Sequence, residues 1–257
     1  MQNNAMTLTV STAVLSVFGA FLRWVQTMTI FEEDTGLPIS SPISTVFVVY
    51  SLAVLLTAIG ATLLLFRGLE ISRDGEEVMH TDSGIPVGLA WLCALAFAAG
   101  GILLMFSSGQ FQVPMLQRLF GAFCVAAGVC LPMLPCRRRS EGLGGIGRKV
   151  IALFLTVFFC FWLIYCYRSY ADNPVLWRFV PHIFAACANA WTMYYVAAWF
   201  FSRTRIIPAL VALPYTVYLN VCVFAEAENL GVTLLTAGTI GIFMILYYVI
   251  TANLCKE

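Results

Sequence analysis

Apolar residues dominate the chain in eight long runs, separated by short polar links. The runs cover residues 6–30, 43–66, 85–106, 113–135, 150–167, 179–201, 206–225 and 230–254. A bilayer core about 30 Å thick is crossed by about 20 helical residues at a rise of about 1.5 Å each. The pattern therefore predicts an all-α fold: a polytopic transmembrane helical bundle of about eight spans, with the first run kept as a helix.

The links between the runs are too short to hold a second folded unit, so residues 1–257 are expected to form a single integral membrane domain. An even number of runs also permits a four-plus-four repeat, with halves 1–135 and 136–257. Run one leads out through Arg23, and run five leads out through Arg168, in each case to an acidic link that contains proline. Coincidence among apolar helices is the alternative interpretation.

Composition supports a membrane protein and excludes several other classes. Hydrophobic residues make up 61% of the chain, charged residues make up 11%, and the mean hydropathy is +0.89. A soluble domain carries about 25% charged residues. The net charge of +1 gives no basic excess, so nucleic acid is not an expected partner. The nine cysteines fall mostly inside apolar runs, which predicts reduced, buried thiols and neither a metal site nor a cofactor.

Basic residues are distributed unevenly between the two ends of the predicted spans. With the amino terminus inside, the inner links and ends carry ten of the 14 basic residues. Basic residues in short links resist translocation across the membrane. Both termini are therefore predicted to be cytoplasmic, with the acidic links around residues 32–34 and 226–228 on the outer side.

The charged residues that lie within or near the outer ends of the spans are the first candidates for a site: Arg23, Arg118, Arg168, Arg178 and His182. A charge inside the membrane costs about 2.5–3.5 kcal/mol unless it snorkels or pairs, so such residues often serve a function. One interpretation is an outward-facing basic pocket for an anionic small molecule or a lipid headgroup. The other is that the arginines pair with the six acidic residues of the outer links.

Polar residues on runs six and seven form a second candidate group, which comprises Asn189, Tyr215, Tyr218 and Asn220. Run six contains Pro181 near its start and run seven contains Pro214. If the helices break at proline, these amides and phenols could line a polar cavity. Alternatively, the two asparagines only form hydrogen bonds between helices.

Small residues at a spacing of four predict close contacts between helices. They form three stripes, Ala90–Ala94–Ala98 on run three, Ala122–Ala126 beside Gly128 on run four, and Ala237–Gly241 on run eight.

Motifs that would define an enzyme were not found in the sequence, which has no zinc-binding helix, nucleophile elbow or phosphate-binding loop. Catalysis is therefore not favoured. Eight spans with a few intramembrane polar residues favour a small-solute transporter or solute-binding membrane protein. The alternative is a non-transporting membrane assembly or lipid-interacting protein, in which the same polar residues are structural.

The opening segment, Phe-Gly-Ala-Phe-Leu-Arg-Trp-Val-Gln at residues 18–26 and Phe-Glu-Glu-Asp-Thr-Gly-Leu-Pro at residues 31–38, carries one resemblance. It is similar to the start of uncharacterised multi-pass membrane proteins of Gram-positive gut anaerobes. The resemblance covers about 20 residues, implies a bacterial plasma membrane and supplies no function.

Overall fold

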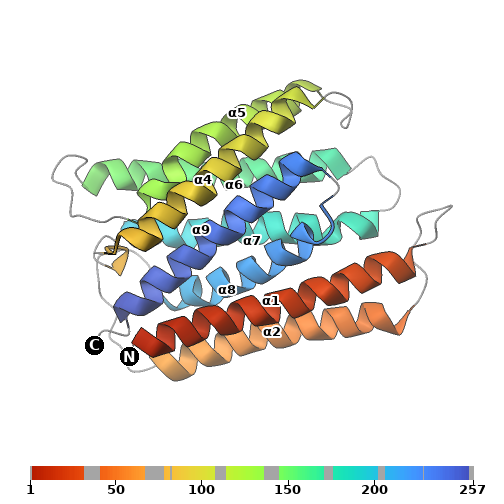
Figure 1. The fold of residues 1–257 in the computed structure, drawn as a ribbon, viewed down its shortest axis with the longest axis horizontal. Helices are drawn as coiled ribbons and strands as arrows, with labels where there is room; N and C mark the ends of the chain where they lie inside the picture. The colour runs from red at the N-terminus through yellow and green to blue at the C-terminus, as the bar shows by residue number, and fades with distance from the viewer. Residues whose placement is uncertain are drawn as a thin grey trace.

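Eight long helices make up the described part of a computed structural model, which covers residues 2–31, 41–66, 78–81, 83–107, 114–135, 145–170, 176–201, 206–227 and 229–254. They are α1 (Gln2–Ile30), α2 (Pro42–Phe66), α4 (Gly84–Phe106), α5 (Pro114–Cys130), α6 (Gly145–Tyr170), α7 (Leu176–Phe200), α8 (Ile207–Phe224) and α9 (Leu230–Leu254). No strand occurs within these ranges. The predicted all-α helical bundle is confirmed (Figure 1).

The surface of the bundle is that of a membrane protein. Seven of the eight helices, all except α7, are long and apolar enough to cross a bilayer. Large apolar side chains point outward along them, including Leu64, Leu95, Phe106 and Ile164. A soluble monomer rarely exposes so much contiguous apolar surface, whereas lipid chains cover it readily. The α7 helix is equally long but carries Asn189, Thr192 and two tyrosines in its second half.

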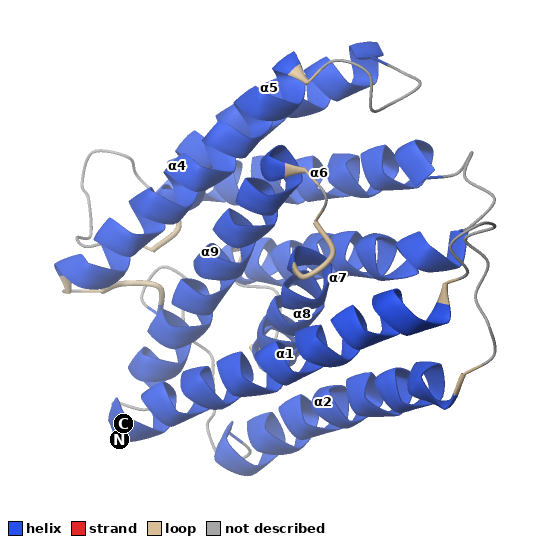
Figure 2. Ribbon diagram, turned by 45° about the vertical axis from the view of Figure 1, so that its right-hand side comes forward, coloured by secondary structure: helices blue, strands red, loops and turns tan. Residues whose placement is uncertain are grey.

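Six helices pack in a closed sequence of neighbours, α4, α5, α6, α7, α8 and α9, with α9 returning to α4. We call this arrangement the six-helix ring. The α1–α2 hairpin packs on the outside of the ring, where both helices contact α8 and α1 also contacts α9. Figures 1 and 2 show α9 crossing the molecule between α4 and α1. The start of α1 and the end of α9 lie at the same end of the bundle, as an even number of crossings requires (Figure 1).

Glycines bring α9 and α5 into close contact with α4, as the small-residue stripes predict. A Cβ atom added at Gly238 of α9 would lie 2.7 Å from the carbonyl oxygen of Cys93, and one at Gly128 of α5 would lie 3.0 Å from the Cβ of Ala98. On α5, however, the contact face contains Gly121, Cys124 and Gly128, whereas Ala122 and Ala126 are exposed. The alanines of the predicted α5 stripe were therefore on the wrong face. Small residues occur on both faces of this helix, so their spacing alone could not identify the face that packs on α4.

Helix ends differ from the predicted runs where charge and proline occur. The α6 helix begins five residues before the predicted start at 150 and takes in Arg148 and Lys149, whose long side chains let a helix extend to the membrane surface. The α5 helix gives way to a 3₁₀ turn, Leu131–Met133, at Pro132. Both α7 and α8 continue through their internal prolines, Pro181 and Pro214. The expectation that helices broken at proline would open a polar cavity is therefore wrong.

Candidate functional site

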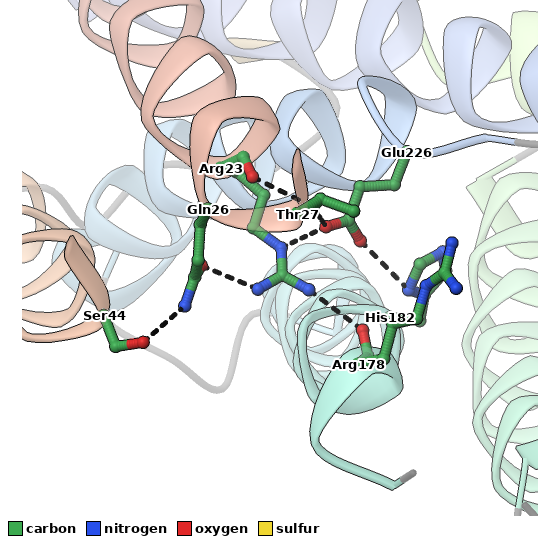
Figure 3. Close-up of polar contacts among 7 residues, drawn as sticks. All are labelled: Arg23, Gln26, Thr27, Ser44, Arg178, His182 and Glu226. Atoms are coloured by element: carbon green, nitrogen blue, oxygen red, sulfur yellow. Dashed lines mark hydrogen bonds and ion pairs between the residues drawn. The ribbon is translucent and has the colours of Figure 1, made fainter. Parts of the chain in front are cut away.

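A buried ion pair joins Arg23, in the last third of α1, to Glu226, two residues after the end of α8 (Figure 3). The Nε of Arg23 contacts the Oε1 of Glu226, and the two side chains are only 3% and 6% exposed. Residues near helix ends usually reach water, but this pair turns inward between the α1–α2 hairpin and the ring. The sequence placed Glu226 in an outer link, and its burial could not be read from that position.

The guanidinium of Arg23 also makes contacts through both of its other nitrogens. Nη1 donates a hydrogen bond to Oε1 of Gln26 at 2.7 Å, and Nη2 donates one to the backbone oxygen of Arg178 at 2.9 Å. Gln26 in turn donates to Oγ of Ser44 on α2, at 3.3 Å. Figure 3 shows the guanidinium between Gln26 of α1, Glu226 after α8 and the backbone oxygen of Arg178 on α7, with Ser44 of α2 beyond Gln26. One side chain therefore connects the hairpin to the ring.

The carboxylate of Glu226 has two further neighbours. Oγ1 of Thr27 donates a hydrogen bond to Oε1 at 2.8 Å, and Nδ1 of His182 lies 3.8 Å from Oε2. Burial raises the pKa of the Glu226 carboxyl, while Arg23 and the Thr27 hydroxyl act in the opposite direction. The charged state of this group thus depends on Arg23 staying in place.

A cavity of about 40 Å³ lies inside the six-helix ring, and each of the six helices contributes to its wall. Its polar lining comes from His182, Asn189, Asn220, Ser169 and Thr236, and its apolar lining includes stacked aromatic rings of α5 and α6. One water needs about 10–15 Å³ of such space, so the cavity has room for water but for no larger solute without movement of the helices. His182 lines this cavity and also faces Glu226, which places it between the ion pair and the interior.

Polar side chains on α7 and α8 pair with each other at the cavity wall and one turn beyond it. Asn220 donates to Oδ1 of Asn189 at 2.7 Å, and Asn189 donates back at 3.3 Å. About one turn further along α7, the hydroxyls of Thr192 and Thr216 lie 2.7 Å apart, and Thr216 also donates to the backbone oxygen of Ala188. All four side chains are buried. We call these four residues the α7–α8 polar seam.

The structure separates the residues that the sequence proposed as a site. It brings Arg23, Arg178 and His182 together at one end of the bundle, and it places His182, Asn189 and Asn220 around one cavity. Arg118 and Arg168 are exposed on α5 and α6.

The two tyrosines lie elsewhere. Tyr218 is buried against Gly19 of α1, and its phenol oxygen is 2.7 Å from Oγ of Ser51 on α2. Tyr215 stacks on Tyr218, with ring centroids 5.9 Å apart. Both residues therefore serve the contact between α8 and the α1–α2 hairpin, away from the cavity wall.

Several site residues were not among the sequence candidates. Gln26 and Thr27 lie three and four residues after Arg23, so helical spacing alone places them beside its side chain. Thr192 lies three residues after Asn189, and Thr216 lies four residues before Asn220. The same helical spacing could therefore have identified both threonines as neighbours of the asparagines. Glu226 was one of the six acidic residues that the alternative interpretation paired with the arginines, and the structure shows that pairing for Arg23. No local signal named Arg23 as its partner, because the contact spans about 200 residues and depends on the packing of α1 against α8.

Across the described residues, no three His, Cys, Asp or Glu side chains lie close enough together to hold a metal ion. The cysteines described there are free thiols, and two further cysteines, Cys136 and Cys255, lie outside the described residues. The links that determine orientation, including residues 32–34, 67–77 and 136–144, also lie outside them, so the orientation stays a prediction.

Fold and surface together define an integral, multi-pass membrane protein with an all-α bundle. Comparison with known proteins adds no family: no family model matches the chain, and no curated protein or solved structure matches it significantly. The functional interpretation therefore rests on the geometry of the site.

Proposed function

We propose that this protein is a small-solute transporter or solute-binding membrane protein whose pathway runs through the six-helix ring. The observation that carries the proposal is the position of His182, which contacts Glu226 on one side and lines the cavity on the other. From there the polar side chains continue inward to the α7–α8 polar seam. Buried polar residues of this kind in a bundle interior mark solute pathways in many membrane proteins.

The size of the cavity means that the structure corresponds to a closed state in this proposal. At about 40 Å³ the cavity admits water only, so a solute requires the helices of the ring to separate. The Arg23–Glu226 pair joins α1 to the end of α8 at the end of the bundle nearest the cavity. Its opening would release that end of α8, which makes the pair the gate in this mechanism.

The nature of the solute follows from the groups that face it. Amides, hydroxyls and an imidazole line the cavity, which suits a small polar solute that forms hydrogen bonds. An anionic group on the solute, or a lipid headgroup, would meet the exposed Arg118 and Arg168 outside the ring. The positive-inside distribution favours an orientation with this end outside the cell, and the opening segment supports a bacterial plasma membrane.

A non-transporting membrane assembly or lipid-interacting protein is the second candidate, and one specific observation favours it. All three guanidinium nitrogens of Arg23 contact protein groups, and the two asparagines satisfy each other. Polar residues that are fully paired in this way need no solute to explain them.

A thermal-shift screen of the purified protein against polar metabolites and against lipids separates the two candidates. Stabilisation by a polar metabolite that is lost in His182→Gln and in Asn220→Leu supports the first. A control variant, Ser51→Ala, removes a partly buried hydroxyl from the α2–α8 contact without touching the cavity, and it should keep the metabolite response. Stabilisation by lipids alone, with no metabolite response in the wild type, contradicts the transporter proposal.

A further inference from the structure

A second and much larger hollow lies at the opposite end of the bundle from the ion pair. It is an open groove of about 530 Å³ between α1, α4 and α9. The last three turns of α9 form its floor, Thr9 of α1 lies on one wall, and Ile85 and Leu89 of α4 lie on the other. Its volume falls within the range of about 300–1,000 Å³ that is usual for ligand sites.

The lining of this groove changes from polar to apolar along the helix axes. Thr81 and Ser83, just before α4, and Asn253, in the last turn of α9, lie at the end of the bundle. Ile85, Leu89, Met244 and Ile245 lie deeper along the same two helices, where the hydroxyl-bearing side chains are those of Thr9 and Tyr248. A molecule that fits both parts has a polar head at the membrane surface and an apolar chain pointing toward the bilayer centre.

The polar end of the groove is held in place by Asn253. Its side-chain nitrogen donates hydrogen bonds to the backbone oxygens of Val78 and His80, both at 2.6 Å. Val78 and Met79 are buried beneath this contact, which fixes the segment that leads into α4. The mouth of the groove is therefore formed before any ligand arrives, which lowers the cost of binding.

We propose that the groove binds one phospholipid of the surrounding bilayer, with an acyl chain along α9 and its phosphate at the start of α4. Water in the apolar part would lose hydrogen bonds, so an acyl chain is the natural occupant of a groove that opens into lipid. Ser83 caps α4 by accepting a hydrogen bond from the N–H of Ile85. Pro86 has no N–H, so the N–H groups of Gly84 and Val87 are the ones in the first turn that favour an anionic group beside it.

Native mass spectrometry of the full-length protein, delipidated and titrated with phosphatidylglycerol, tests this site. Ala252→Trp and Leu89→Trp place a large ring in the groove from opposite sides, and both should weaken retention of the single tight phospholipid by about tenfold or more, the equivalent of about 1.4 kcal/mol. Leu95→Trp changes an exposed residue of the same helix that does not line the groove and should leave retention unchanged.

Two results would overturn the proposal. One is equal retention of phosphatidylglycerol in the wild type and both groove variants. The other is equal affinity for diacylglycerol, which has the same chains but lacks the phosphate. Circular dichroism and size-exclusion profiles matched to the wild type establish that each variant is folded. Because the groove and the cavity lie at opposite ends, neither result bears on solute transport.

Discussion

Arg23 and Glu226 hold each other inside the bundle although each lies near the end of its element, and they connect the first helix to the turn after α8. A buried charge is tolerated when its partner is also buried and both are hydrogen-bonded. Thr27 and Gln26, on the same face of α1, supply those additional bonds. The α1–α2 hairpin is therefore attached to the ring by a polar contact as well as by the packing of apolar side chains.

Replacing Glu226 by Gln should destabilise the protein by about 3–5 kcal/mol, because Arg23 would stay buried without its countercharge. The double variant Arg23→Gln/Glu226→Gln should lose less free energy of unfolding than the two single variants lose in sum. The free energy of unfolding, measured in mixed micelles for the complete double-mutant cycle, checks this prediction. Additive losses would mean that the two side chains do not interact.

The single variant Arg23→Gln should show a deficit in stability that grows with pH. Without Arg23, burial is opposed only by the Thr27 hydroxyl and by the charge of Arg178, so the pKa of Glu226 rises further. A carboxyl whose folded pKa lies above its unfolded pKa contributes stability that is complete below the unfolded value and is lost as pH rises through the folded value. Thermal unfolding of this variant, measured from acid to neutral pH, tests the effect. The double variant Arg23→Gln/Glu226→Gln is the control, because it lacks the carboxyl and its stability should not show this dependence on pH.

Asn220→Leu should cost about 1–2 kcal/mol, because it leaves the amide of Asn189 buried without its partner. Replacing both asparagines by leucine should recover part of the loss, since no unpaired amide then remains. Denaturant unfolding of the two single variants and the double variant is the appropriate measurement. A double variant less stable than either single variant would argue that the amides bind something other than each other.

Gly238→Ala should destabilise the contact between α4 and α9 by about 1–3 kcal/mol, because the added methyl group would meet the backbone oxygen of Cys93 at 2.7 Å. Gly88→Ala, on α4, is the matched control, because nothing lies within 4 Å of its added Cβ. That variant should be unchanged or more stable by about 0.5–1 kcal/mol, as helix propensity favours alanine. A comparison of the two melting temperatures decides the point.

Single cysteines at Ser41, Ser140 and Asn229, in a background without other cysteines, test the predicted orientation. In intact cells, a membrane-impermeant thiol reagent should label the first and third positions and leave Ser140 protected, since basic links stay inside. Labelling at Ser140, or protection at both Ser41 and Asn229, would reverse or refute the orientation.

The fold was largely readable from the sequence, whereas the site was readable only in parts. Apolar runs of membrane length define the eight helices directly, because the bilayer sets the length. Pairings such as Asn189 with Asn220 follow from the need to satisfy amides in lipid. Pairing between the arginines and the acidic residues of the outer links was one interpretation of the sequence. The choice of Glu226 as the partner of Arg23 could not be derived, because it depends on which helices are neighbours, and nothing local encodes that α1 packs on α8.

The composition of α7 has a consequence for how the chain enters the membrane during synthesis. Alone in lipid, α7 would expose Asn189 and Thr192 to hydrocarbon, and each unsatisfied polar group there carries a cost. Their partners, Asn220 and Thr216, lie on the helix that emerges next from the ribosome. Pairing with α8 removes this cost from the nascent α7, which favours entry of the two helices into the bilayer as a pair.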